Sequence, residues 1–351
     1  MSNEIIIPTG EIIKEYLDYY GYTQKEACKR LDISEKHLSN VLNSNSRLTE
    51  ELALKLEKLM PISANYWLTL EVKYREYLAR EEEAYVLNNA DLKFLSNKFK
   101  FNEAFKGMNY SLPEQAIEML KLLKINSFDN FDAAYSNLEV NFMQDDGEKE
   151  SIAVWINLCE EEVELQNNDL DAIQFSPQKL KNELSILKYI ALNEDVDQSI
   201  SNARKVLNGI GVYVVLREAI TNCKVRGVLT TYRKKPAIYL SGRFKTHDNI
   251  WFAFIHEIAH LLLHYNNQDT IILSENDILS QEGEANIFAR DFFVDRNSFN
   301  KFKLESDFSI SSVVGFANEQ NVSPGIVVAF LQHDKCIKFN ELNKLKKHFK
   351  L

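Results

Sequence analysis

The stretch Trp251–His264, WFAFIHEIAHLLLH, constrains the fold of this chain more than any other segment. It places His256, Glu257 and His260 inside an apolar run that is compatible with a helix. Residues four apart lie on one helical face, so the two imidazoles are expected to converge. The flanks are so apolar that the helix should be buried, and burying three polar side chains without partners would cost several kcal/mol. The sequence therefore predicts a buried helix whose histidines share a metal ion or an equivalent polar network.

This pattern also predicts a chemistry. Two neutral imidazoles and a third ligand can hold a metal ion and leave one position for water, as in zinc hydrolases. We predict His256 and His260 as metal ligands and Glu257 as the catalytic base that takes a proton from water. Zn²⁺ is the expected cofactor, and the donor set also suits Mn²⁺ or Fe²⁺. The segment Glu282–Arg290, EGEANIFAR, offers carboxylates for the third ligand at the start of a second helical run.

Taken together, these segments resemble the ImmA/IrrE family of metallopeptidases. The resemblance covers roughly residues 175–345 and also includes the strand-rich stretch Val212–Leu240 and the later segment VSPGIVVAFLQ, residues 322–332. It implies a zincin-like fold of the gluzincin type, with Glu282 as the third ligand and Asn286 next to a ligand histidine. Glu284 is the competing ligand. It is turned about 200° from Glu282 on a helix, so we expect it on the far side.

Three other residues of this half, His264, Tyr232 and Tyr239, could take part in the site or in the structure around it. We expect His264 to be structural, because a three-histidine zincin needs its third histidine after a glycine turn. Tyr232 and Tyr239 are candidates for stabilising an oxyanion, and the residues alone favour neither. The stretches Val212–Leu216, Arg226–Arg233 and Ala237–Leu240 predict a small, largely antiparallel sheet, with a turn at Lys234–Pro236. The resemblance implies that a substrate is added as a strand along residues 227–232.

Composition sets the broad class of the protein. A chain of 351 residues suggests two or three domains, and 45% hydrophobic residues are ample for packed cores. The N-terminus lacks a secretory pattern and no apolar run is long enough to span a membrane, so we expect a cytoplasmic protein. The four cysteines are scattered without ligand-like spacing and are expected to be buried thiols. The net charge of -10 argues against whole-molecule affinity for nucleic acid and leaves local binding open.

The N-terminal region predicts short helices separated by capping residues. A first helix is expected over residues 11–20. Thr23, Ser34 and Thr49 are expected to cap helices over residues 24–31, 35–42 and 50–60. Two eight-residue helices joined by a tight turn are typical of a helix-turn-helix, whose second helix enters the major groove of DNA.

This region is similar to the XRE class of helix-turn-helix proteins, and more narrowly to HigA-type antitoxins. The similarity rests on TGEII at residues 9–13, LNS at residues 42–44 and ISANYWLTL at residues 62–70. The residues expected to face DNA are Gln24, Lys36, His37, Ser39, Asn40, Asn43 and Arg47. Seven basic against six acidic residues over residues 21–60 give only a weak positive footprint. A protein-docking role therefore stays open beside DNA binding.

We expect an α+β protein in three parts: a helix-turn-helix domain over residues 1–80, a helical connector over residues 81–171 and a zincin-like domain over residues 172–351. The main hypothesis is a metal-dependent endopeptidase with a regulatory module and no membrane partner. The resemblance implies that it cuts a transcriptional repressor or antitoxin, often of phage or mobile-element origin. A homodimer is a further possible partner, which the sequence does not decide. The alternative is an antitoxin-like DNA-binding regulator whose metal domain senses a ligand or holds a partner without cutting it.

Overall fold

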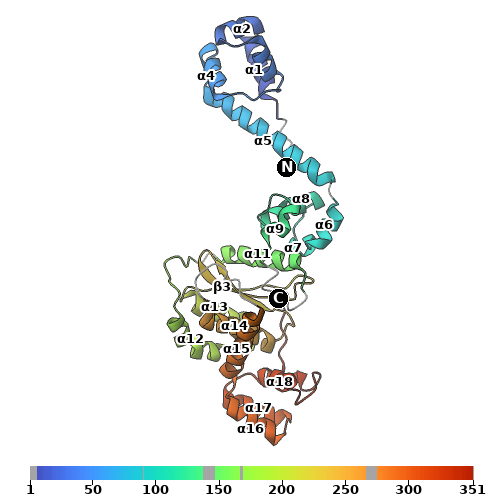
Figure 1. Ribbon diagram of the computed structural model, residues 1–351, viewed down its shortest axis with the longest axis vertical. Coiled ribbons are helices and arrows are strands. Elements are labelled where there is room, and N and C mark those ends of the chain that lie inside the picture. Colours follow the sequence, from blue (N-terminus) through green and yellow to red (C-terminus); the bar gives the residue numbers. More distant parts are fainter. Residues whose placement is uncertain (1–5, 90, 137–146, 167–168, 266–274, 351) are drawn as a thin grey trace. The chain divides into compact units, whose positions relative to one another are not determined.

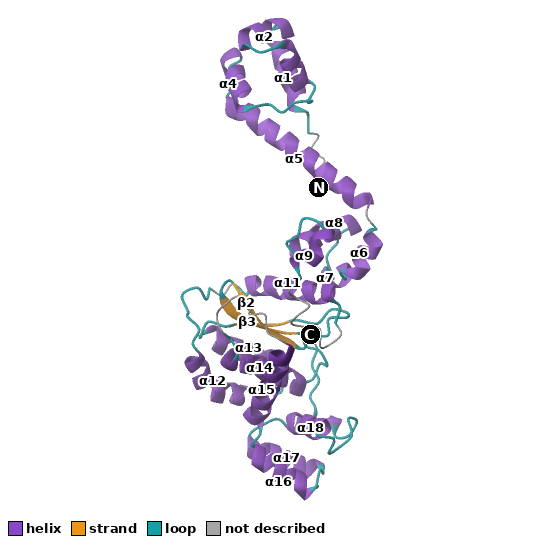
Figure 2. Ribbon diagram, viewed as in Figure 1, coloured by secondary structure: helices purple, strands orange, loops and turns teal. Residues whose placement is uncertain are grey.

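The computed structural model describes residues 6–89, 91–136, 147–166, 169–265 and 275–350. Contacts divide the chain into two units, Met1–Leu92 and Lys93–Leu351, and each is described by itself. Helices dominate both units and one small sheet lies in the second (Figure 2), which confirms the α+β class. Within the described ranges, no helix has the length and apolarity needed to cross a membrane. The three-part division at residues 80 and 171 stays a prediction.

The first unit is a bundle of short helices around an apolar core. Its helices are α1 (Thr9–Tyr19), α2 (Gln24–Leu31), α3 (Glu35–Leu42), α4 (Glu50–Leu59) and the longer α5 (Ala64–Asn89). The expected caps are present: Thr23 forms a capping box with Glu26, and the hydroxyls of Ser34 and Thr49 accept hydrogen bonds from the first turns of α3 and α4. The core includes Trp67 from α5, which is fully buried.

A close helix contact closes this bundle at Gly10. A Cβ atom at position 10 would lie 2.3 Å from the carbonyl oxygen of Val41 and 2.5 Å from that of Leu42. Both distances are far below van der Waals contact, so any larger residue would push α1 away from the end of α3. Gly10 therefore sets how closely the first helix packs on the second helix of the helix-turn-helix pair.

The second unit begins with small helices and continues with the elements that surround the sheet. The first group is α6 (Leu92–Lys98), α7 (Phe101–Ala104), α8 (Leu112–Leu122), η1 (Phe128–Asn130), α9 (Phe131–Ala134) and α11 (Lys149–Leu165). The second is α12 (Pro177–Ile190), α13 (Val196–Asn208), β1 (Tyr213–Leu216), β2 (Gly227–Tyr232), β3 (Lys235–Leu240), α14 (His247–Leu263) and α15 (Glu275–Phe293). The last is α16 (Arg296–Glu305), α17 (Ile310–Gln320), α18 (Pro324–His333) and η3 (Asn343–Leu345).

The sheet has the order β1-β3-β2, so β2 lies at an edge. Helix α11 lies on one side of it and α13 and α14 lie on the other (Figure 1). The central strand is buried on both faces: Ile238 and Leu240 join the core with α14, whereas Tyr239 lies near Cys159 of α11. Burial on both faces explains why β3 reads as a continuous apolar run.

The sheet differs from the predicted one in pairing and in the position of its turn. β2 and β3 are antiparallel as expected, but β1 pairs in parallel with β3, so the sheet is mixed. Residues 217–226 connect β1 to β2 on the far side of β3, and β2 then pairs with β3 as a hairpin. As a result, β1 and β3 run in the same direction. The hairpin turn is at Arg233 and Lys234, both with positive φ, and β3 starts at Lys235. Without glycine or asparagine, this turn has no sequence signal.

A half-buried ion-pair cluster joins three helices of the second unit. Asp334, just after α18, accepts two hydrogen bonds from Arg290 of α15, at 2.7 and 2.9 Å. Lys303 of α16 contacts the same carboxylate at 2.8 Å. Burial works against the charge of Asp334, but hydrogen bonds from Arg290 and Lys303 outweigh it and hold its pKa well below the ordinary value of 3.8. The cluster thereby fixes α15, which carries part of the candidate site described below.

We predict that Asp334→Asn lowers the free energy of unfolding at pH 7 by about 2 kcal/mol, because it leaves two half-buried cations without their shared carboxylate. Since the folded-state pKa is depressed, the contribution is complete above pH 3.8 and is lost as the pH falls further toward the folded-state pKa. Urea unfolding at pH 7 and pH 3 measures both effects.

The matched control is Asp291→Asn in α15, which breaks an exposed pair with Arg296 at the start of α16. It should change the unfolding free energy by less than about 1 kcal/mol. Equal losses in the two variants would contradict the role assigned to Asp334.

Candidate metal centre

Helix α14 presents two histidines on one face, as their spacing predicts. The helix begins at His247, four residues before the expected start, and its remaining faces are buried by the sheet and by α15 and α18. The Nε2 atoms of His256 and His260 lie 3.0 Å apart. Their side chains are 14% and 15% exposed, so the pair is sheltered and still reachable from solvent.

Helix α15 supplies a carboxylate to the same point. Glu282 places one oxygen 3.0 Å from His256 Nε2 and the other 3.1 Å from His260 Nε2. Ala285 and Ala289 are fully buried, and such small side chains allow α15 to pack closely on α14. The helix begins at Glu275, so Glu282 lies well inside it and not at its start as expected.

The three side chains have the donors that a divalent metal ion needs. The ligand atoms of His256, His260 and Glu282 all lie within 4.8 Å of one another. Two imidazole nitrogens and one carboxylate oxygen match the donor set of catalytic zinc sites. Electron pairs that converge this closely repel one another unless a proton or a cation lies between them. By donor chemistry and by spacing, these residues fit a divalent cation.

Charge and hydrogen bonding around the cluster agree with this reading. Asn286, one turn after Glu282, accepts a hydrogen bond from His256 Nδ1 through its Oδ1 at 3.1 Å. Burial lowers the pKa of His256, but the hydrogen bond to Glu282 and the charges of Glu257 and Glu282 together outweigh burial and raise the pKa above 6.5. Burial likewise opposes the charge of Glu282, and hydrogen bonds from both histidines hold its pKa well below 4.5.

Glu257 lies against the edge strand and not among the converging ligand atoms. Its side chain is buried, and a backbone hydrogen bond from Leu229 of β2 reaches its carboxylate. A Cβ atom at Gly227 would lie 2.8 Å from Glu257 Oε1 and 2.9 Å from its Cγ, so glycine is needed for this contact. Burial raises the pKa of Glu257, although the neighbouring His256 and His260 partly offset the rise. A buried carboxylate with a raised pKa is suited to accept a proton.

Glu284 lies elsewhere than expected. It is not on the far side of α15: its Oε2 is 3.1 Å from His264 Nε2, and His264 Nδ1 is 3.1 Å from His260 Nδ1. The expectation considered only the angle around α15 and not the position of His264, the C-cap residue of α14, which lies within reach of the Glu284 side chain. His264 therefore contacts a candidate ligand, His260, which its expected structural role did not include. Its spacing of four from His260 was the signal that could have placed it on the same face.

Neither candidate tyrosine faces the cluster. Tyr239 is directed toward α11, where burial raises its pKa far above the ordinary value. The Tyr232 hydroxyl donates to Glu164 of α11, and burial followed by this bond raises its pKa to about 12. The assignment of either residue as an oxyanion stabiliser is therefore not supported by their positions.

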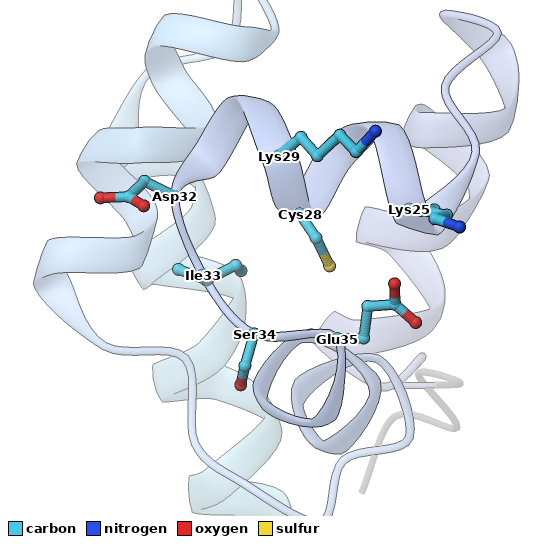
Figure 3. Close-up of a pocket in the computed structure, with 7 residues that line it drawn as sticks. All are labelled: Lys25, Cys28, Lys29, Asp32, Ile33, Ser34 and Glu35. Atoms are coloured by element: carbon cyan, nitrogen blue, oxygen red, sulfur yellow. The ribbon is translucent and has the colours of Figure 1, made fainter.

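In the first unit, the residues expected to face DNA lie on or next to α2 and α3. Gln24, Lys36, Asn43 and Arg47 are exposed, and His37, Ser39 and Asn40 are half-buried. A cavity of about 360 Å³ lies between α2 and the start of α3 (Figure 3), lined by residues that include Lys25, Lys29 and Glu35. Burial raises the pKa of the Cys28 thiol in its wall, so this cavity offers no reactive thiolate.

We predict that Glu282→Ala lowers metal affinity by more than tenfold, because it removes one of three donors. Metal content after dialysis of the purified protein against Zn²⁺, and then against buffer, measures the loss. Asp291→Ala, on the same helix and paired only at the exposed surface with Arg296, is the control and should keep the wild-type metal content. Full retention of metal by Glu282→Ala would remove Glu282 from the ligand set.

Comparisons with known proteins agree with this arrangement. The peptidase M78 family model, described as the IrrE N-terminal-like domain, matches residues 211–332, and a helix-turn-helix model matches residues 13–67. An HTH-type transcriptional regulator of Haemophilus influenzae is 32% identical over 65 residues, which are 18% of this chain and 61% of the relative. Virulence-associated protein A' of Dichelobacter nodosus is 36% identical over 66 residues, 18% of this chain and 57% of the relative.

These alignments cover only part of each protein. The chain spans about three fifths of the length of these curated relatives. No solved structure matches the chain significantly. The first match contains the sheet, His256, His260 and Glu282, and the second contains α2 and α3. The chain thus joins an XRE-type helix-turn-helix domain to a domain of the ImmA/IrrE metallopeptidase family.

Proposed function

We propose that this protein is a metal-dependent endopeptidase with a helix-turn-helix regulatory module. The observation that carries the proposal is the convergence of His256, His260 and Glu282 beside a separate, buried Glu257. Holding a metal ion requires only the first three. Glu257 is a buried carboxylate beside the ligands and contacts Gly227 and Leu229 of β2. Such a residue favours hydrolysis over a purely structural site. In this proposal the peptidase domain is residues 172–351, the connector residues 81–171 and the regulatory domain residues 1–80.

His256, His260 and Glu282 would hold Zn²⁺, with Mn²⁺ as the alternative. When bound, such an ion supplies Lewis acidity toward a peptide carbonyl and makes a neighbouring water easier to deprotonate. Asn286 holds the ring of His256 through Nδ1 and leaves Nε2 directed at the ligand position. The protein therefore supplies a sheltered donor set with one imidazole already oriented.

Glu257 carries the proton in this mechanism. Its carboxylate accepts a proton from the attacking water and then donates it to the nitrogen of the leaving amine. Burial raises its pKa, which brings its basicity closer to neutral pH. The hydrogen bond from Leu229 and the contact with Gly227 keep the carboxylate from turning into another rotamer. The same residue thus serves as base and then as acid without leaving its place.

The edge strand β2 offers a place for an extended peptide. Among the described residues, β2 pairs only with β3, so its other edge is available for strand addition. Its first residue, Gly227, contacts Glu257, and Thr231 lies beside Tyr265, just after α14. A peptide added along β2 would therefore run beside α14 with its backbone near the proton carrier. This favours an unfolded or loop segment of a protein as substrate.

We predict that Glu257→Gln keeps the bound metal and loses proteolysis by about 10²- to 10⁴-fold, because the amide cannot accept the proton from water. Glutamine is nearly the same size as glutamate, so the contact of residue 257 with Gly227 of β2 is preserved. Metal content and cleavage of a candidate repressor are measured on the same sample. A variant that cleaved at the wild-type rate would exclude Glu257 as the base.

The regulatory module is proposed to bind DNA through α3. The proposal is supported by the helix-turn-helix match over residues 13–67 and by the exposure of Lys36 and Asn43. Arg47 and Gln24 are proposed to contact phosphates, and His37, Ser39 and Asn40 to contact base edges. DNA binding would place the protein in the compartment that holds the DNA. A homodimer would present two copies of α3 to successive major grooves.

We predict that full-length protein binds DNA around its own gene with an affinity that falls steeply with salt, because phosphate contacts release counterions. Arg47→Ala should reduce the slope of log affinity against log salt by about 0.9. Asn40→Ala should cost about 1–3 kcal/mol on the preferred sequence with the slope unchanged.

The charge-matched control is Lys58→Ala, an exposed position at the end of α4 that is not among the proposed contacts. It should leave the salt slope within error of wild type. If no DNA from this region is bound in a salt-dependent way, the module is better explained as a protein dock.

The substrate is proposed to be a transcriptional repressor or antitoxin, since a helix-turn-helix module would bring the peptidase to such proteins on DNA. The second candidate function is regulation without cleavage, which is favoured by the regulators among the relatives. Incubating the protein with candidate repressors, with and without a chelator, separates the two. Chelator-sensitive fragments support the peptidase. Binding of the repressor with no fragments over many hours supports the regulator.

A further inference from the structure

A chain of three side chains leads from the surface to one ligand histidine. Glu284 Oε2 lies 3.1 Å from His264 Nε2, and His264 Nδ1 lies 3.1 Å from His260 Nδ1. We call these residues, Glu284, His264 and His260, the carboxylate–imidazole chain. It combines the middle of α15 with the end of α14, and the proposed mechanism does not use it.

The hydrogen-bond chemistry of this chain has one consistent solution. An ionised carboxylate only accepts hydrogen bonds, so the proton of neutral His264 lies on Nε2. Its Nδ1 then has a free electron pair and accepts a hydrogen bond from His260. His260 therefore carries a proton on Nδ1. When a metal ion replaces the proton that His260 Nε2 shares with Glu282 at 3.1 Å, Nε2 is the ligating atom.

Asn286 has the corresponding role for His256. Its Oδ1 lies 3.1 Å from His256 Nδ1, so the two ligand histidines are oriented from opposite ends of the cluster. The two arrangements differ in exposure. The His264 side chain is 12% exposed and the Glu284 side chain is 59% exposed. An exposed carboxylate adds little to folding, and its removal should leave the fold unchanged.

We propose that Glu284 and His264 are positioning residues that hold His260 in its ligating tautomer. This inference rests on the proposed metal-dependent function, because the tautomer of His260 matters only if Nε2 binds an ion. Hydrogen-bond partners of ligand histidines typically contribute 10- to 100-fold to metal affinity. In the carboxylate–imidazole chain, Glu284 at the surface would contribute to metal affinity through the imidazoles of His264 and His260.

The first test is Zn²⁺ affinity, measured on the full-length protein by competition with a chromogenic chelator. Glu284→Ala should bind Zn²⁺ at least tenfold more weakly than wild type. Glu284→Gln removes the same charge and keeps an acceptor oxygen, so it should stay within about threefold of wild type. Asp291→Ala, which removes an exposed charge paired with Arg296, should be unchanged. A Glu284→Ala affinity equal to wild type, or a Glu284→Gln affinity as weak as Glu284→Ala, would overturn the proposal.

The second test reads the tautomer directly in metal-free protein. Nitrogen-15 spectra of histidine-labelled samples distinguish a protonated from a bare ring nitrogen. His264 should carry its proton on Nε2 in wild type and in Glu284→Gln, and should lose this preference in Glu284→Ala. The same tautomer in all three proteins would contradict the positioning role. If wild type binds no Zn²⁺, the proposed function fails, and these spectra still decide whether the chain sets the tautomer.

Discussion

The packing of α14 against α15 brings together electron pairs of His256, His260 and Glu282 that repel one another. Two imidazole nitrogens lie 3.0 Å apart and a carboxylate contacts both, an arrangement that is stable only when positive charge lies among them. Bringing the groups together requires α14 and α15 to pack closely, and the buried Ala285 and Ala289 allow it. It also requires the helices to keep their places under that repulsion. The cluster of Asp334, Arg290 and Lys303 fixes the far end of α15 and opposes any separation.

The sheet covers one face of α14 with apolar side chains. Ile238 and Leu240 of β3 pack against α14, and β2 covers Glu257 at the sheet edge. The face of α14 that packs against the sheet has apolar surroundings, whereas His256 and His260 can be reached from solvent. The helix therefore has two environments. The carboxylate of Glu257, the proposed proton carrier, occupies the first, and the candidate ligands His256 and His260 occupy the second. His256 and Glu257 are adjacent in sequence and point about 100° apart around α14, so neighbouring residues can occupy the two environments.

Much of this architecture could be predicted because local signals and tertiary contacts agree. The capped helices α2, α3 and α4 follow from Thr23, Ser34 and Thr49, and the convergence of His256 and His260 follows from helical spacing. The failures have physical causes. The turn at Arg233 and Lys234 uses left-handed backbone without glycine, and the parallel pairing of β1 depends on a long-range crossover. The position of Glu284 depends on where α14 ends, and helix ends carry the weakest signals.

The contact between Gly227 and Glu257 depends on the absence of a methyl group at position 227, and it joins the strand edge proposed for a substrate to the proposed proton carrier. A Cβ atom at position 227 would meet the Oε1, Cγ and Cδ atoms of Glu257 at 2.8–3.2 Å, and no ligand atom of His256, His260 or Glu282 is among these nearest atoms. Glycine and alanine codons differ by one base. Under the proposed mechanism, one mutational step at position 227 would therefore separate a peptidase from a regulator that keeps the same fold and the same candidate ligand set.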